Sequence, residues 1–170
     1  MAIQNINVER FSVTSSKSFR EVIGAFDVGV GHPDMKAFRE SVIAAKTYAE
    51  LEKVVHAAIE PHDLMEFTRF DLGEVLRKRY GTEARQSLRL VLGNPLIMSQ
   101  MVEHVPDAGS YAPVTILIDE RQDGVHLSYD RMASSLAPYG NAEALKVARD
   151  LDSKVEALLK VAASERGGSI

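Results

Sequence analysis

Two segments in which apolar and polar side chains alternate, 112–120 and 124–130, meet at the turn-forming pair Asp123-Gly124. Alternation with this period is typical of β-strands, and an Asp-Gly pair between such segments predicts a β-hairpin. The loop is either Asp123-Gly124 alone or residues 121–124. The two registers differ by two residues, so the same side chains face the core in both. The face expected in the core carries Val114, Ile116, Ile118, Val125, Leu127 and Tyr129, and the opposite face carries Thr115, Leu117, Asp119, His126, Ser128 and Asp130.

The rest of the chain alternates between strand-like and helix-like segments. Strands are predicted over 6–14, 64–70 and 87–95. Helices are predicted after the Ser18–Glu21 capping box, over 33–60 with a joint near Thr47, over 73–81, from Pro95, and from the N-cap Asn141. This order indicates an α+β fold in which helices cover one face of a sheet. We expect 164–170 to form a disordered tail.

Composition excludes several classes of protein. A length of 170 residues fits a single domain over 1–170. The net charge of −4 argues against a nucleic-acid partner, because such proteins present a basic surface to phosphates. The absence of cysteine excludes disulfides and thiolate chemistry. The sequence also shows no apolar run of the roughly 18 residues that a membrane span needs, and its first residues do not resemble a secretory signal. We therefore expect a cytoplasmic protein without a membrane partner.

The polar face of the hairpin has the residue types of a serine-nucleophile triad in His126, Ser128 and Asp130. Residues two apart on a strand are about 6.5 Å apart, whereas a nucleophile and its base need a contact of about 3 Å. The spacing therefore argues against a triad. Two other interpretations stay open for this face. It is either solvated, with Asp119 paired across the strands to His126 or Ser128, or it is the floor of a ligand site.

Metal and phosphate sites have weak support. The histidines show neither HxH nor HExxH spacing, so we expect no metal site and no cofactor. The stretch "GVGHPD" lacks the Gly-Lys-Ser/Thr sequence of a phosphate-binding loop and predicts a helix break. In "LGNP", Asn94 is expected to cap a helix that begins at Pro95, with an anion-binding corner as the alternative.

Residues 93–134, "GNPLIMSQMVEHVPDAGSYAPVTILIDERQDGVHLSYDRMAS", resemble the core of the bacterial domain-of-unknown-function family 302. The segment "FTRFD" (67–71) is similar to the family's strand that ends in aspartate before a helix. The resemblance implies a TATA-binding-protein-like fold, with a curved antiparallel sheet of about five strands backed by helices. It leaves 32–62 as an inserted helical pair. Many members have Asp-His where this chain has Asp71-Leu72, so a role of that histidine would not carry over.

Three functions follow as hypotheses. The first is a small-ligand-binding or sensing module, suggested by a polar sheet face beside the inserted helices. We expect this module to be homodimeric and to hold its ligand between the sheet and those helices. The second is an enzyme of unknown class that uses Asp119, His126 and Asp71 as acid–base groups. The third is a protein-interaction module that uses the exposed sheet face. The candidate ligand-binding residues are Asp71, Asn94, Asp119, His126 and Ser128.

Overall fold

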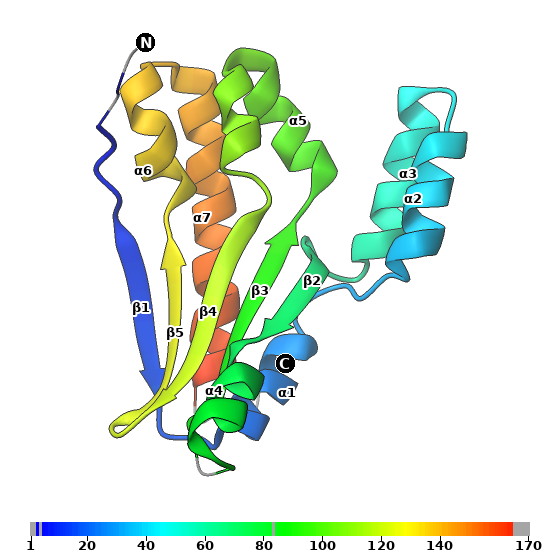
Figure 1. The fold of residues 1–170 in the computed structure, drawn as a ribbon. Helices are drawn as coiled ribbons and strands as arrows, with labels where there is room; N and C mark the ends of the chain where they lie inside the picture. The colour runs from blue at the N-terminus through cyan, green and yellow to red at the C-terminus, as the bar shows by residue number, and fades with distance from the viewer. Residues whose placement is uncertain (1–2, 4, 83, 165–170) are drawn as a thin grey trace.

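The protein is described by a computed structural model that covers residues 3, 5–82 and 84–164. Its centre is an open antiparallel sheet in the order β1-β5-β4-β3-β2 (Figure 1). The strands are β1 (Arg10–Ser15), β2 (Met65–Asp71), β3 (Ser87–Gly93), β4 (Val114–Arg121) and β5 (Gly124–Asp130). The predicted α+β fold with five antiparallel strands is confirmed.

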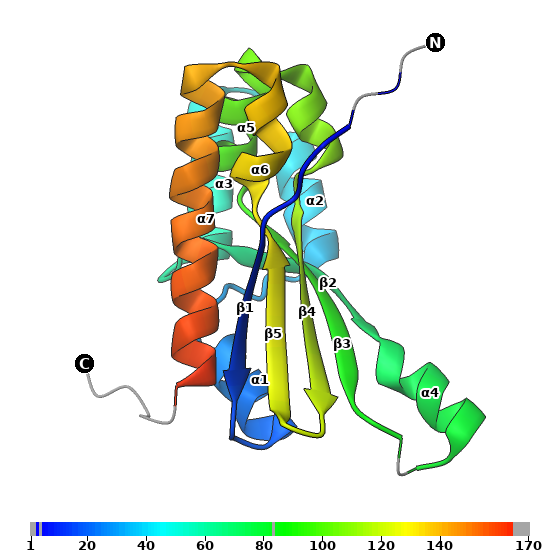
Figure 2. The same cartoon turned by 90° about the vertical axis from the view of Figure 1, so that its left-hand side faces the viewer.

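Four of the helices cover one face of this sheet. The helices are α1 (Phe19–Asp27), α2 (Met35–Ala44), α3 (Tyr48–Ile59), α4 (Leu72–Tyr80), α5 (Pro95–His104), α6 (Met132–Leu136) and α7 (Ala142–Ala163), with the short 3₁₀ turns η1 (Pro106–Ser110) and η2 (Ala137–Tyr139). Helices α1, α5, α6 and α7 lie on the same side of the sheet (Figure 2). The other face is left open along β1, β5 and β4 in the described part of the chain. The predicted tail falls mostly on 165–170, which lie outside the described residues.

The helix boundaries follow the capping signals in the sequence. Ser18 and Glu21 form the predicted capping box at the start of α1. Thr47 accepts the backbone N–H of Glu50 and so separates α2 from α3, and Asn141 caps α7 in the same way. A side-chain oxygen at each of these positions satisfies a backbone N–H that has no partner within its helix. The joint near Thr47 and the start at Asn141 are confirmed.

The hairpin has the second of the two predicted registers. Ile116 lies opposite Tyr129, and Asp119 lies opposite His126. Arg121 also pairs with Gly124, so the connection is shorter than the predicted loop 121–124. All six side chains of the predicted core face are buried: Val114, Ile116, Ile118, Val125, Leu127 and Tyr129. They pack against α7 through residues such as Leu151, Val155 and Leu159.

Strand β1 is shorter than the sequence predicts. The alternating pattern over 6–14 indicates a strand, but pairing begins only at Arg10, opposite Asp130. Asp130 is the last residue of β5, after which the chain enters α6. Residues 5–9 therefore have no neighbouring strand on that side in the described part of the chain, and alternation alone cannot supply one.

The helical pair α2–α3 lies beyond the β2 edge of the sheet and does not cover the open face (Figure 1). Its apolar side chains form a separate small core with Met65 of β2 and Leu96 of α5. The residues of this core are Phe38, Val55, Ile59, Met65 and Leu96. The pair therefore packs beside the sheet within the same chain.

Gly31 joins this helical pair to the sheet, and its replacement by alanine is expected to weaken the join. Gly31 bridges to Met65, and a Cβ at Gly31 would lie 2.2 Å from the carbonyl oxygen of Ala58. Overpacking of this kind costs about 1–3 kcal/mol, so Gly31→Ala should lower the free energy of unfolding by that amount in urea denaturation. Gly24→Ala is the control, since nothing lies within 4 Å of its Cβ. A helix interior should gain about 0.5–1 kcal/mol from that change. Equal changes in the free energy of unfolding for Gly31→Ala and Gly24→Ala would contradict the close approach of Gly31 to the Ala58 carbonyl oxygen.

Candidate functional site

The open face, here called the outer face, carries rows of side chains that run across the strands. Paired residues on neighbouring antiparallel strands lie side by side on the same face. The row nearest α6 holds Arg10, Asp130, Thr115 and Val91; the middle row holds Ser12, Ser128, Leu117 and Arg89; the row nearest the β4–β5 turn holds Thr14, His126, Asp119 and Ser87. Most of these side chains are short or polar, which leaves space above the sheet.

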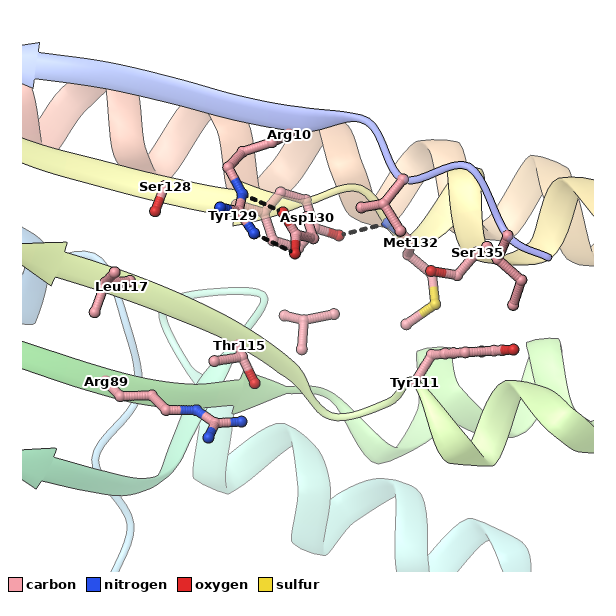
Figure 3. Close-up of a pocket in the computed structure, with 13 residues that line it drawn as sticks. Arg10, Arg89, Tyr111, Thr115, Leu117, Ser128, Tyr129, Asp130, Met132 and Ser135 are labelled. Carbon is pink, nitrogen blue, oxygen red and sulfur yellow. Dashed lines mark hydrogen bonds and ion pairs between the residues drawn. The ribbon is translucent and has the colours of Figure 1, made fainter.

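A hollow of about 460 Å³, here called the outer-face hollow, opens at the α6 end of this face (Figure 3). Its polar half is formed by Arg10, Arg89, Thr115, Ser128 and Asp130. Its other half is mostly apolar and is formed by Ile6, Val8, Tyr111, Val114 and Met132, with Ser135 beside Met132. The volume falls within the range of roughly 300–1,000 Å³ that is typical of small-molecule sites.

The two arginines of the hollow differ in their partners. Arg10 makes a two-pronged ion pair with Asp130, with Nε–Oδ1 at 2.6 Å and Nη2–Oδ2 at 2.8 Å. The Arg10 guanidinium donates these hydrogen bonds and holds the pKa of the Asp130 carboxyl below its usual range. Arg89 lies across the hollow on β3 and makes no hydrogen bond or ion pair with any residue that the structure describes (Figure 3). The hollow therefore has one cation that no described residue neutralises.

The apolar half is held in place by contacts at the start of α6 and the end of η1. Met132 is buried, and its backbone N–H donates to Asp152 Oδ1 over 2.8 Å. Tyr111 packs edge-on against Tyr139 with ring centroids 6.5 Å apart, and their hydroxyls are 3.0 Å apart. These contacts give the apolar end a defined shape without filling it.

Ser128 is the only one of the five predicted ligand-binding residues among those that line this hollow. Asp119 and His126 lie opposite each other, as one of the two predicted pairings requires. However, their hydrogen bonds go elsewhere: Asp119 accepts from Arg121 Nε at 2.8 Å, and His126 Nε2 lies 2.8 Å from Asp123 Oδ1. The bond with His126 lowers the pKa of Asp123.

The other two predicted residues cap helices. Asp71 accepts the backbone N–H of Glu74 and pairs with Arg77 at 2.6 Å. Burial raises the pKa of Asp71, but these hydrogen bonds outweigh it and the net shift is downward. Asn94 accepts the backbone N–H of Leu96, and its Nδ2 donates to the carbonyl of Asp63 at 3.0 Å. The five predicted residues are therefore not brought together in one site.

The sequence reasoning missed Arg10, Arg89 and Tyr111. Alternation along the strand puts Arg89 on the same face as Ser87, as the structure has it, but nothing in the sequence marks Arg89 as a site residue. Its position opposite Leu117 depends on β3 pairing with β4. Arg10 and Tyr111 belong to segments far from Arg89 in the sequence. No local sequence pattern predicts that Arg10, Arg89 and Tyr111 line the same hollow.

Asn94 is expected to respond to substitution as a buried cap with two bonds. Loss of a cap costs about 1 kcal/mol, so Asn94→Ala should lower the free energy of unfolding by at least that amount. The sequence alone predicts that Asn94→Asp is nearly neutral. The structure changes this expectation, because a carboxylate oxygen would replace Nδ2 against the Asp63 carbonyl. Asn94→Asp should therefore also destabilise in urea denaturation.

Asn141→Asp is the matched control for Asn94→Asp. Asn141 caps α7 through Oδ1 alone, by accepting from Ala144 at 2.9 Å. An aspartate at a helix N-terminus is at least as good a cap, so this change should be neutral or slightly stabilising. If Asn94→Asp lowered the free energy of unfolding no more than Asn141→Asp, the hydrogen bond from Asn94 to Asp63 would not contribute to stability.

The described residues support neither a metal site nor a membrane-spanning helix. No group of three or more acidic or histidine side chains there is arranged to hold a metal ion. No helix among them is both long enough and apolar enough to cross a membrane.

Comparison with known proteins places the chain in a family. The model of the family described as domain of unknown function DUF302 matches residues 40–162. The chain belongs to the DUF302 family. Among solved structures, it is similar to the crystal structure of an uncharacterized conserved DUF302 protein from Bacillus stearothermophilus, with 12% identity and a TM-score of 0.62. That alignment covers 90% of this chain and 97% of the other. No curated protein matches. The resemblance seen in residues 93–134 is thus confirmed.

Proposed function

We propose that this DUF302 protein is a small-ligand-binding module whose ligand occupies the outer-face hollow. The observation that carries the proposal is Arg89, an arginine without a partner among the described residues, beside a hollow with an apolar end. Ligand sites are typically apolar concavities with a few polar groups that orient the ligand. The outer-face hollow has this composition.

This proposal changes the expected position of the ligand. The sequence suggested a site between the sheet and the helical pair 32–62. None of the residues that line the outer-face hollow belongs to that pair. The small core that the pair shares with Met65 and Leu96 points instead to a packing role. Cytoplasmic location and homodimer formation stay predictions from the sequence.

The local contacts favour binding over acid–base catalysis. Of the groups considered for an enzyme, Asp119 is paired with Arg121 and Asp71 with Arg77. His126 is paired with Asp123. A general acid or base must reach the substrate, and each of these groups already has a protein partner at hydrogen-bond distance. None of the three lines the outer-face hollow.

Filling the hollow tests the proposal. Leu117→Trp and Ser128→Tyr add bulk from two strands, and Val75→Trp adds similar bulk on α4 as the control. Saturation-transfer NMR with a mixture of small organic acids, amines and neutral compounds reports binding to each variant. We expect signals from the wild type and Val75→Trp, and their loss from both filled variants, with folding checked by circular dichroism. The same signals from all four proteins would refute a ligand site in the hollow.

A further inference from the structure

We infer that the ligand of the outer-face hollow is an amphipathic monocarboxylate, with its carboxylate on Arg89 and its apolar tail directed to Tyr111 and Met132. This inference rests on the proposed function and names the chemical class of the ligand. It follows from the charge balance of the hollow, from its free hydrogen-bond donors and from its division into two halves.

The charge balance of the hollow favours a single negative charge on the ligand. Three charged side chains line it: Arg10, Arg89 and Asp130. Arg10 and Asp130 neutralise each other through two short hydrogen bonds, so Arg89 leaves the hollow with one net positive charge. A dianion would have to compete with Asp130 for Arg10. A monoanion leaves that ion pair intact and pairs with Arg89 alone.

The donors around Arg89 suit a carboxylate. A guanidinium presents a planar fork that matches the two oxygens of a carboxylate. Thr115 lies on β4, the strand next to Arg89, and Ser128 lies one strand further away on β5; both line the same half of the hollow. Neither hydroxyl has a hydrogen-bond partner among the described residues. The Thr115 hydroxyl, on the strand next to Arg89, can therefore donate to a carboxylate that is bound there.

The apolar half requires a ligand with a hydrocarbon or aromatic part. Val8 is about half exposed, and it faces the hollow together with Ile6 and the ring of Tyr111. A ligand tail that covers these side chains removes apolar surface from water. Each methylene that becomes fully buried should tighten binding about threefold to fourfold. Small inorganic anions would leave this half of the hollow empty.

Octanoate is a suitable probe, and three compounds of the same chain length are its controls. Octylamine reverses the charge, 1-octanol removes it, and octanedioate puts a second carboxylate at the end of the tail. Dissociation constants are measured by calorimetry for the wild type, Arg89→Gln, Arg89→Lys and the filled variant Leu117→Trp, with Ser128→Tyr as a second filled variant. Butanoate gives the dependence on tail length.

We expect octanoate to bind the wild type more tightly than any of the other compounds. Arg89→Gln should weaken octanoate binding by about tenfold or more, since a hydrogen bond to a charged group is lost. Arg89→Lys keeps the charge but not the fork and should give an intermediate value. Neither change at Arg89 should alter the weak binding of 1-octanol.

The outcomes separate this inference from the proposed function. Octanoate binding that is unchanged in Arg89→Gln, or 1-octanol binding as tight as octanoate binding, would overturn the monocarboxylate inference. If binding were still lost in both filled variants, the hollow would remain a ligand site. If the wild type bound none of the probes, the inference would fail. Binding that was the same in the wild type and the filled variants would refute the proposed function as well.

Discussion

Replacement of Asp152 by alanine is expected to lower the free energy of unfolding by about 3 kcal/mol or more, because each unsatisfied buried donor costs about 1–3 kcal/mol. The Tyr129 hydroxyl and the Ala133 N–H lose the one acceptor that they have among the described residues, while the Met132 N–H keeps a second acceptor in the Tyr129 hydroxyl. Asp152 lies on α7 and is only 5% exposed. Its Oδ1 accepts from the Tyr129 hydroxyl at 2.6 Å and from the Met132 N–H at 2.8 Å, and its Oδ2 accepts from the Ala133 N–H at 3.1 Å. One carboxylate thus joins β5, α6 and α7.

Urea denaturation of Asp152→Ala and Asp150→Ala measures this effect. Asp150 is an exposed residue on the same helix, and its substitution should change stability by less than about 0.5 kcal/mol. Asp152→Asn keeps one acceptor oxygen but places an amide N–H₂ near a donor. Its loss of unfolding free energy should therefore lie between those of Asp152→Ala and Asp150→Ala. Equal midpoints for Asp152→Ala and Asp150→Ala would show that the three bonds do not stabilise the fold.

Replacement of Tyr129 by alanine is expected to cost about 3–5 kcal/mol, the range for removal of a buried aromatic ring. The ring is 1% exposed in the core between the sheet and α7. Its hydroxyl donates to Asp152, and burial together with the Asp152 charge raises the Tyr129 pKa well above its usual range. The substitution removes both the ring contacts and the donor.

Tyr129→Phe separates these two contributions. It keeps the ring and removes the hydroxyl, so it should cost about 1–2 kcal/mol. Tyr80→Ala is the exposed control and should be close to neutral, since Tyr80 is 65% exposed. The double variant Tyr129→Phe with Asp152→Ala should lose less than the sum of the single changes, because both remove the same bond. An unchanged melting temperature for Tyr129→Ala would overturn the assignment of Tyr129 to the core face of the sheet.

The same pair of residues shows which parts of the fold are readable in the sequence. Alternation alone assigns Tyr129 to the core, because every second side chain of a strand lies on the same face. A register shift of two residues leaves that face unchanged. The helix starts at Ser18, Asn94 and Asn141 were readable for a similar reason, since a cap bonds backbone groups two or three residues away. By contrast, Asp152 reads as an ordinary polar residue on a helix, and its burial depends on where α6 packs.

The candidate site needed the tertiary structure. The sequence by itself determined which face of the hairpin is polar, and it therefore determined the position of Ser128 on that face. Only the strand order β1-β5-β4-β3-β2 decided that Arg10 and Arg89 lie on either side of Ser128. Only the packing of η1 and α6 decided that Tyr111 and Met132 close the apolar end. Local signals act within a few residues of the chain, whereas the hollow joins segments more than a hundred residues apart, and such contacts follow from packing rather than from any local pattern.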